Sequence, residues 1–513
     1  MQKKRMNVLW LMSDQHNANC MGGGGHPDVR TPNLDAIAER GALFSHAYCN
    51  NPICAPSRSS FLSGQYVKSH GITGNFVREV RSKAPNLGRL FRENGYETAL
   101  IGKAHLPYQW VVEGFDYIRF SDLSDAAPDD PASCHYFNDL VEADLADLYD
   151  QGRLNPGEPG YGNRAFVSRL AEEYSLEAWT GRKAVEFLEQ RDSSNPFFLK
   201  VSFQRPHDPY APPAERMDEY DPEALSLPDN ACDYLERKFA GKPKFQQEYI
   251  QQQKGMGYPF LSQNRAELKE QMAAHFTLIT MIDDAIGTVL DALKAQGELE
   301  NTVIVYTADH GDFAGEHGLM LKNLGIYESI HRVPLLIAGP GVPAGTVRDM
   351  LVESVDLYPT LADLAGLSCE PDVDGVSRVG ELVSGEGGCD YAVCEWEFAE
   401  PQSSVCAIRD GRYRFVFYDE FPQDGELYDL HADPGELNNL FHDPGVRDVI
   451  KMFRARMDAF LSERRHVYRF RDDEQAVRNV QDQATILIHQ KGKKWSEVCK
   501  VEDPQRKPAA CSA

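Results

Sequence analysis

A cysteine, a proline and an arginine lie close together in the segment Cys54-Ala55-Pro56-Ser57-Arg58. The spacing predicts a helix that begins near Ser57, because proline is tolerated at or before the first helical turn. Unpaired backbone N–H groups and the positive end of the helix dipole would then face Cys54, beside the guanidinium of Arg58. The arrangement predicts a site for an anion such as sulfate or phosphate. A cysteine that only fills space beside a turn is the simpler interpretation.

Two other segments carry acidic and polar side chains where a predicted strand ends. Asp14 and Gln15 follow the first strand, and Asp309 and His310 follow a later one. In an open parallel sheet the carboxyl ends of the strands meet at one edge, where ligands collect. Oxygen and nitrogen atoms from the two segments can therefore meet at one metal ion. A lone Asp–His pair at a strand end is more often a cap, so the prediction depends on the combination with Cys54.

Lysine and histidine side chains follow two further predicted strands, and one more lysine lies after His310. They are Lys103 and His105 in Gly102–Leu106, His207 in Arg205–Tyr210, and Lys322 at the end of Gly318–Lys322. A sulfuryl group in transfer carries negative charge on its nonbridging oxygens, and fixed cations such as Lys103 and Lys322 stabilise it. Solvated lysines and histidines bonded to loop carbonyls are the alternative, which the sequence favours for Lys322 taken alone. Asn75 either points into the same pocket or closes a turn.

The segment at Cys54 resembles the Cys-x-Pro-Ser-Arg signature of the type I sulfatases of the alkaline-phosphatase superfamily. The resemblance extends from Asn7 to about Leu440 and includes the Gly-Lys-x-His-Leu and Pro-His-x-Pro motifs. It implies hydrolysis of a small-molecule sulfate ester. It also implies that a formylglycine-generating maturation enzyme reads Cys54, Pro56 and Arg58 in the unfolded chain and oxidises the cysteine to formylglycine.

The same resemblance assigns Asp14, Gln15, Asp309, His310 and the modified Cys54 as ligands of a divalent metal. The best-known sulfatases have a second aspartate where Gln15 stands and an asparagine where His310 stands. Glutamine with histidine resembles the choline-sulfatase and phosphonate monoester hydrolase branch instead. The family implies Ca²⁺, whereas the imidazole makes Mn²⁺ a rival, because calcium prefers oxygen ligands and manganese accepts nitrogen.

The family's mechanism implies a role for each remaining residue. Arg58 holds the formylglycine hydrate, and Lys103 and Lys322 bind the sulfate group during in-line attack. His207 or Lys322 protonates the departing alkoxide. His105 then takes the proton of the second hydroxyl, which expels sulfate and restores the aldehyde. The resemblance therefore identifies Cys54, Arg58, Lys103, His105, His207 and Lys322 as catalytic residues.

One alternative keeps the site and changes the substrate to a phosphonate monoester or a phosphodiester. Gln15 and His310 favour this alternative. Lys103 and His105 favour sulfate esters. The phosphonate branch, which this chain otherwise resembles, has uncharged residues in place of that pair. Aryl, choline, sugar and lipid sulfates all remain compatible with the sequence, since the long loops form the distal part of the pocket.

A second alternative is a protein that binds a sulfated ligand without turnover. It applies if Cys54 remains a thiol, since the cations would still attract an anion. A phosphatase that uses the thiol of Cys54 directly is excluded by spacing. Its phosphate-binding loop needs a longer segment between cysteine and arginine than the three residues that separate Cys54 from Arg58.

Short apolar runs alternate with helical patterns over the first two-thirds of the chain. Strands are predicted at 7–12, 97–101, 197–203, 302–307 and 334–338, and helices at 33–40, 84–94, 176–190 and 273–295. The alternation predicts an α/β fold with a largely parallel sheet sandwiched by helices, as the resemblance to the alkaline-phosphatase superfamily also implies. Segments 122–162 and 212–257 interrupt the pattern and are predicted to be long loops that shape the pocket.

The pattern changes near residue 375. Short strands at 391–397, 404–409, 413–418 and 426–429 and a helix at 445–464 predict a smaller α+β subdomain with an antiparallel sheet. We therefore divide the chain into a catalytic α/β domain at 1–374, a C-terminal subdomain at 375–470 and a tail at 471–513. We expect the tail to take part in contacts within a homo-oligomer.

Charge and composition exclude several classes of function. The net charge of −25 over 513 residues argues against binding to nucleic acid or to an anionic membrane surface, since both require a basic face. The apolar stretch at 8–12 is too short for a secretory signal, and the eleven cysteines lack metal-ligand spacing. We expect a cytoplasmic protein with reduced thiols.

Overall fold

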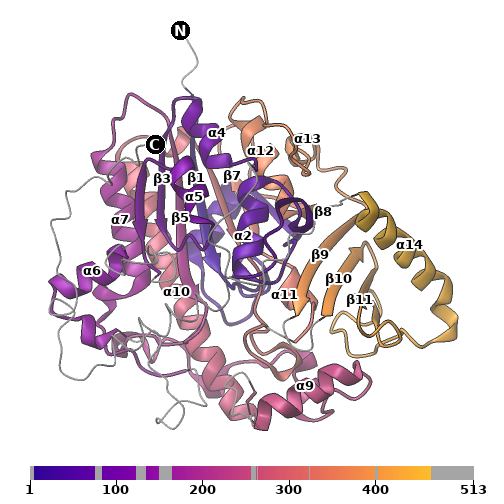
Figure 1. Cartoon of the computed structure of the whole chain (residues 1–513). Helices are drawn as coiled ribbons and strands as arrows, with labels where there is room; N and C mark the ends of the chain where they lie inside the picture. Colours follow the sequence, from indigo (N-terminus) through magenta and orange to yellow (C-terminus); the bar gives the residue numbers. More distant parts are fainter. Residues whose placement is uncertain are drawn as a thin grey trace, which may run out of the picture.

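The computed structural model describes residues 5–75, 84–122, 134–149, 165–255, 261–262, 264–322, 324–398 and 403–463. Within these residues the strands form one eight-stranded sheet and one four-stranded sheet. The large sheet lies at the centre of the molecule, and the small sheet lies beside it with a helix over its outer face (Figure 1). The tail at 471–513 lies outside the described residues.

The large sheet has the order β4-β3-β5-β1-β6-β7-β2-β8. Its strands are β1 (Asn7–Asp14), β2 (Gly41–Tyr48), β3 (Glu97–Gly102), β4 (Tyr117–Phe120), β5 (Phe197–Pro206), β6 (Thr302–Ala308), β7 (Leu335–Ala338) and β8 (Thr346–Glu353). In the described chain β7 runs antiparallel to β6 and β2, and the other neighbours in the sheet are parallel. The predicted α/β fold with a largely parallel sheet is confirmed, although β2, β4 and β8 were not predicted.

Helices cover both faces of this sheet, and β1 shows why. Its alternate residues Val8, Trp10 and Met12 point into one apolar core, and Leu9 and Leu11 point into another. The first core is closed by α2 (Cys54–Ser63), α4 (Leu87–Glu93), α5 (Tyr108–Gly114) and α12 (Leu357–Leu364). The second is closed by α1 (Pro32–Arg40), α7 (Leu176–Gln190) and α10 (Arg265–Ala295). Because both faces are covered, the central strands β1, β5 and β6 are buried along their whole length.

Helix α10 is longer than predicted. It begins at Arg265 rather than at residue 273, and the side chain of Asn264 accepts a hydrogen bond from the backbone N–H of Glu267 as its N-cap. The added turns include four charged residues, but the buried Leu268 and Met272 continue the apolar period that leads to Phe276, so the sequence did carry a signal for the earlier start. No helix in the described part of the chain combines the length and the apolar character needed to cross a bilayer.

The first predicted loop, at 122–162, contains a helix. Helix α6 (His135–Glu142) packs Tyr136, Phe137 and Leu140 against Trp179 of α7. The second, at 212–257, consists mainly of short turns but includes α8 (Cys232–Leu235) and α9 (Lys244–Gly255). The remaining short helices are α3 (Val67–His70), α11 (Glu328–His331) and α13 (Val379–Ser384).

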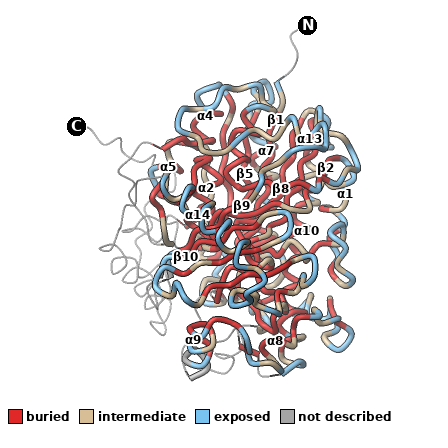
Figure 2. The backbone as a smooth tube through the Cα atoms, turned by 90° about the vertical axis from the view of Figure 1, so that its right-hand side faces the viewer, coloured by how far each residue is buried: buried red, intermediate tan, exposed pale blue. Residues whose placement is uncertain are grey.

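The small sheet is antiparallel and has the order β12-β11-β10-β9. Its strands are β9 (Tyr391–Phe398), β10 (Ser403–Asp410), β11 (Tyr413–Tyr418) and β12 (Glu426–Asp429), and α14 (Arg447–Glu463) packs on it. These elements confirm the predicted strands and helix. Figure 2 shows buried residues along the strands of both sheets and exposed residues on the outer helices and loops.

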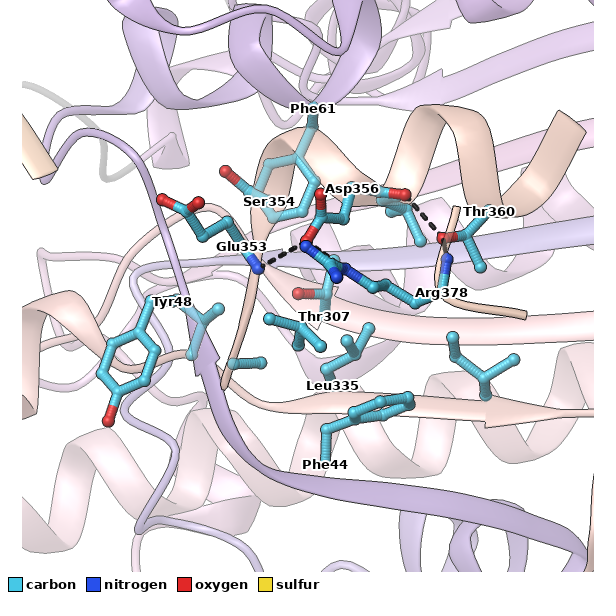
Figure 3. A pocket seen from close by; sticks show the side chains of 15 residues that line it. Phe44, Tyr48, Phe61, Thr307, Leu335, Glu353, Ser354, Asp356, Thr360 and Arg378 are labelled. Atoms are coloured by element: carbon cyan, nitrogen blue, oxygen red, sulfur yellow. Dashed lines mark hydrogen bonds and ion pairs between the residues drawn. The ribbon is translucent and has the colours of Figure 1, made fainter. Parts of the chain in front are cut away.

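Buried carboxylates join the two sheets. Arg414 on β11 is fully buried and pairs with Glu328 of α11 and, at 2.6 Å, with Glu436. Glu353, at the end of β8, accepts hydrogen bonds from the backbone N–H of Val393 on β9 at 2.8 Å and from the hydroxyl of Tyr66 at 2.6 Å. Burial and the neighbouring Asp356 raise the pKa of Glu353 to about 7. The carboxyl groups of Glu353 and Asp356 both lie along the pocket in Figure 3, and Asp356 pairs there with Arg378.

Candidate active site

Four neighbouring strands bring the predicted residues to one edge of the large sheet. Strands β3, β5, β1 and β6 are adjacent and parallel, so their carboxyl ends lie together. Each strand is followed at once by one of the predicted residues, or ends in one: Lys103 follows β3, His207 follows β5, Asp14 ends β1 with Gln15 after it, and Asp309 follows β6. The sheet topology therefore assembles residues that lie up to three hundred positions apart in the sequence.

Cys54 is the first residue of α2, which begins three residues before the predicted start at Ser57. Pro56 still lies in the first turn, where its missing N–H removes no helical hydrogen bond. All ten residues of α2 are buried, so the helix has no polar and apolar faces that would mark its start in the sequence. Asn75 accepts a hydrogen bond from the backbone N–H of Ala55 at 3.1 Å and thereby holds the N-terminus of α2 at the site.

Around Cys54 lie the side chains that can hold a metal ion. Its Sγ is 3.3 Å from Nε2 of His310 and 3.7 Å from Oδ1 of Asp14, and Oδ1 of Asp309 is 3.7 Å from the same imidazole nitrogen. One ligand atom from each of these four buried residues lies within 4.8 Å of the others. Two carboxylates and an imidazole form a donor set that suits a divalent cation able to accept both oxygen and nitrogen.

Gln15 contributes an amide oxygen on the same side. Its Oε1 accepts a hydrogen bond from Nζ of Lys322 at 2.5 Å, and that Nζ lies 3.7 Å from Sγ of Cys54. Lys322 is 6% exposed, so it is not the solvated surface lysine of the alternative interpretation. The structure thus brings Gln15 and Lys322 into the group around Cys54.

Arg58 neutralises the two carboxylates from the opposite side. Its guanidinium donates from Nε to Oδ2 of Asp309 at 2.7 Å and from Nη2 to Oδ2 of Asp14 at 3.1 Å. Its Nη1 donates to the hydroxyl of Ser202 at 2.8 Å and to the backbone oxygen of Lys103 at 3.0 Å. The ammonium of Lys103 also lies 2.7 Å from Oδ2 of Asp14. Each carboxylate therefore turns one oxygen to these cations and the other toward Cys54 and His310.

These charges shift the titration of the groups at the centre. Burial raises the pKa of the Cys54 thiol, but Lys322, Lys103 and His310 outweigh burial and hold that pKa well below its ordinary value. Burial lowers the pKa of His310, yet the carboxylate of Asp309 and the side chain of Cys54 together outweigh burial and raise that pKa to about 9. The site is therefore strongly polarised toward an anion at position 54.

His105 and His207 both reach Cys54. A hydrogen bond with His105 contributes to the low pKa of the thiol, and Nε2 of His105 lies 3.3 Å from the backbone oxygen of Asn75. Interaction with Cys54 acts to raise the pKa of His207, and Nδ1 of His207 lies 2.8 Å from the backbone oxygen of Asp208. Burial and then Lys322 lower the pKa of His207 to about 4.

Sequence reasoning missed several residues that hold this group in place. The hydroxyl of Ser57 donates to the backbone oxygen of Asp309 at 2.5 Å, and Asp122 lies 3.6 Å from the ammonium of Lys103. Asp312 accepts a hydrogen bond from the side-chain amide of Gln15 at 2.6 Å. Ser57 lies in the signature segment and Asp312 lies two residues after His310, so their positions were a usable signal, whereas Asp122 and Ser202 gave none.

Comparisons with known proteins agree with this geometry. Residues 6–367 match the family model "Sulfatase", and residues 315–463 match the model for the C-terminal part of N-sulphoglucosamine sulphohydrolase. The chain is 30% identical to a choline-sulfatase of Rhizobium meliloti (strain 1021), over 83% of this chain and 80% of the relative. It is 31% identical to an arylsulfatase of Clostridium perfringens (strain 13 / Type A), over 83% and 88%. The phosphonate monoester hydrolase of Agrobacterium radiobacter shares the fold, with a TM-score of 0.74 at 24% identity over 90% of this chain and 96% of that one.

Proposed function

The chain belongs to the sulfatase family and is a sulfuric ester hydrolase, and on that premise we propose that it cleaves a sulfate monoester with a formylglycine derived from Cys54. The observation that carries the proposal is the position of Cys54. Its side chain starts a buried helix and lies against Lys322, His310 and Asp14. Formylglycine supplies a hydrated aldehyde, which carries two hydroxyls on one carbon. The second hydroxyl allows the sulfate to leave by cleavage of a C–O bond. A serine has no second hydroxyl and lacks this route.

A divalent cation completes the proposed site. Asp14, Gln15, Asp309 and His310 would hold it together with the modified side chain at position 54. When bound, the cation lowers the pKa of a coordinated hydroxyl and neutralises charge on the sulfate oxygens. Calcium is the family's ion, and the imidazole of His310 makes manganese the second candidate.

The cationic residues of the chain orient the substrate. Arg58 fixes the two carboxylates, as its bonds to Asp14 and Asp309 indicate. Lys103 and Lys322 approach the centre from different loops and stabilise the charge that develops on the nonbridging oxygens. Because they are fixed before the substrate arrives, this stabilisation needs no rearrangement during the reaction.

Two residues move protons in this proposal. Lys322 is a better acid for the departing alkoxide than His207, because a pKa of about 4 leaves His207 neutral at pH 7. His105 is the base for the second hydroxyl. If its Nε2 carries the hydrogen and donates to the backbone oxygen of Asn75, its Nδ1 is the nitrogen that accepts a proton.

Sulfate esters are preferred over phosphonate esters in this proposal because Lys103 and His105 are both present and both reach the centre. Gln15 and His310 support a phosphonate monoester or phosphodiester as the second candidate. A maturation enzyme that acts on Cys54, a cytoplasmic location and assembly into a homo-oligomer complete the proposal.

The test combines mass spectrometry with a substrate panel. The tryptic peptide that contains Cys54 gives the fraction converted to formylglycine in each preparation. We expect hydrolysis of an aryl sulfate to rise in proportion to that fraction and to vanish in Cys54→Ala. Faster turnover of a phosphonate monoester would favour the second candidate. Binding of a sulfated ligand by fully converted protein without turnover would contradict the proposal.

A further inference from the structure

Asp312 connects three loops of the site. Its carboxylate is buried and accepts hydrogen bonds from the amide nitrogen of Gln15 at 2.6 Å and the hydroxyl of Tyr210 at 2.9 Å, both at Oδ2. Its Oδ1 accepts from the backbone N–H groups of Ala314 at 2.7 Å and Leu321 at 3.0 Å. Gln15 follows β1, Tyr210 lies three residues after His207, and Leu321 precedes Lys322. One carboxylate thus contacts each loop that carries one of these predicted site residues.

The contact with Gln15 decides which way its amide points. A carboxylate has only acceptors, so the atom of Gln15 that faces Asp312 has to be the nitrogen. On the opposite side, Nζ of Lys322 has only donors, so the atom that faces it, 2.5 Å away, has to be the oxygen. The two neighbours together exclude the flipped amide. As a result the oxygen, which a divalent cation prefers, lies on the side of Lys322, whose Nζ is 3.7 Å from Sγ of Cys54.

The backbone around Asp312 also needs such support. Gln15, Ala314 and Leu321 have φ angles of 63°, 47° and 67°, in the left-handed region that residues other than glycine rarely adopt. Such conformations persist where surrounding contacts determine them. Asp312 binds all three of these residues, through the side chain of Gln15 and through the backbone of the other two.

We propose that Asp312 is a positioning residue that fixes the amide orientation of Gln15 and thereby sets one oxygen ligand of the metal site. The inference rests on the proposed function, because it concerns the ion proposed there. Asp312 does not act on the substrate itself. It determines which atom of Gln15 meets the ion and Lys322.

The test is the substitution Asp312→Asn, with metal affinity as its readout. The new amide nitrogen would face the amide nitrogen of Gln15, so one contact of Gln15 has to be lost. Gln15 either moves away from residue 312 or flips, which turns its nitrogen toward the ion and Lys322. We expect the affinity for Ca²⁺ or Mn²⁺, titrated separately by calorimetry into chelator-treated protein, to fall by about 10- to 100-fold. The matched control is Asp283→Asn. Asp283 is equally buried and accepts hydrogen bonds from the backbone N–H groups of Asn33 and Leu34, away from the site.

Rescue separates this role from general support of the fold. In the double variant Asp312→Asn with Gln15→Glu, the hydrogen bond reverses, because the new carboxylate accepts from the new amide and keeps an oxygen toward the ion. We expect the double variant to bind metal more tightly than Asp312→Asn alone, and to do so even if the single variant does not fold. Wild-type affinity in Asp312→Asn, or a double variant that binds no better, would overturn the inference. A wild-type protein that binds neither ion would overturn the proposed metal site itself.

Discussion

At the scale of single residues, Asp14 and Asp309 each serve two neighbours at once. One oxygen of each carboxylate bonds to Arg58, and the other lies toward His310. The positive charge of Arg58 and the positive charge of a bound metal would therefore neutralise the same two carboxylates. The stability of the protein therefore depends on both the guanidinium of Arg58 and the bound metal.

Replacement of Arg58 tests this sharing. In Arg58→Met the buried carboxylate of Asp309 loses its guanidinium partner, while that of Asp14 keeps Lys103. We expect a loss of about 3–5 kcal/mol in the free energy of unfolding when metal is removed by a chelator. With saturating Ca²⁺ the loss should be smaller, because the ion neutralises the same carboxylates and binds the folded state. Urea unfolding in chelator and in Ca²⁺ measures the difference.

Arg89→Met is the matched control for that experiment. Arg89 pairs with Glu113 and Glu370 and is largely buried, but neither carboxylate belongs to the site. The loss in free energy of unfolding that Arg89→Met causes should be the same with and without Ca²⁺. An equal loss for Arg58→Met under the two conditions would contradict the shared neutralisation.

The residues that meet at the candidate site were accessible from the sequence, whereas their supporting contacts were not. Cys54, Lys103 and His310 stand in short motifs whose chemistry can be argued from residue type. Ser202 and Asp122 lie in no such motif. Ser202 lies on β5 and Asp122 follows β4, so their contacts become visible only when both strands are placed beside β3. A hydrogen bond between distant loops leaves no local pattern, so the sequence predicts the participants better than their partners.

At the scale of elements, the end of β3 shows how closely the strands are packed at the site. Gly102 has a φ angle of 100°, and a Cβ atom there would lie 1.9 Å from the backbone oxygen of Ser202 on β5. The next residue, Lys103, donates its backbone N–H to that same oxygen at 2.8 Å. The position of the Lys103 ammonium therefore depends on the absence of a side chain at residue 102.

Gly102→Ala is expected to separate the two strand ends and displace Lys103. Gly95→Ala is the control, because Gly95 also has a positive φ angle, 73°, but its nearest neighbour would be the end of the Arg5 side chain at 3.7 Å. Gly95→Ala should cost about 1–2 kcal/mol from the backbone alone. Gly102→Ala should lose more stability and also lose kcat/KM for an aryl sulfate. Similar thermal unfolding and activity in the two variants would argue against the packing explanation.

The strands that were predicted and those that were missed differ in burial. The predicted strands β1, β5 and β6 lie in the middle of the sheet and are apolar on both faces. Of the three missed strands, β4 and β8 are the two edges and β2 lies next to β8, and all three include partly exposed positions. An edge strand needs fewer apolar residues, so its signal is weaker. The antiparallel direction of β7 has no sequence signal, because a run of four apolar residues does not encode its orientation.

At the scale of the whole molecule, Glu353 connects the two sheets and makes their junction sensitive to pH. Its pKa of about 7 in the folded protein lies above the ordinary value of 4.5. The folded state therefore binds the proton more tightly than the unfolded state. The stability that this group contributes is complete below pH 4.5 and is lost as the pH rises to 7.

Glu353→Gln removes this dependence. The amide oxygen can still accept from Val393 and Asn50, and it carries no charge at any pH. We expect the variant to match the wild type at pH 4.5 and to exceed it by about 3 kcal/mol at pH 8, measured as free energy of unfolding in urea. Glu300→Gln, at a side chain that is 82% exposed, should leave the pH dependence unchanged. Parallel pH profiles for wild type and Glu353→Gln would contradict the assignment.

The complete burial of α2 limits the period in which Cys54 is accessible in a newly made chain. Cys54 is 1% exposed once the molecule has folded, so the proposed maturation enzyme could reach it only before this helix docks against the sheet. Folding and the proposed maturation would therefore compete for the same nascent segment, and the faster process would decide whether a given copy is converted. Slower synthesis or a lower growth temperature should enlarge the active fraction, while copies that fold first remain dormant until they unfold.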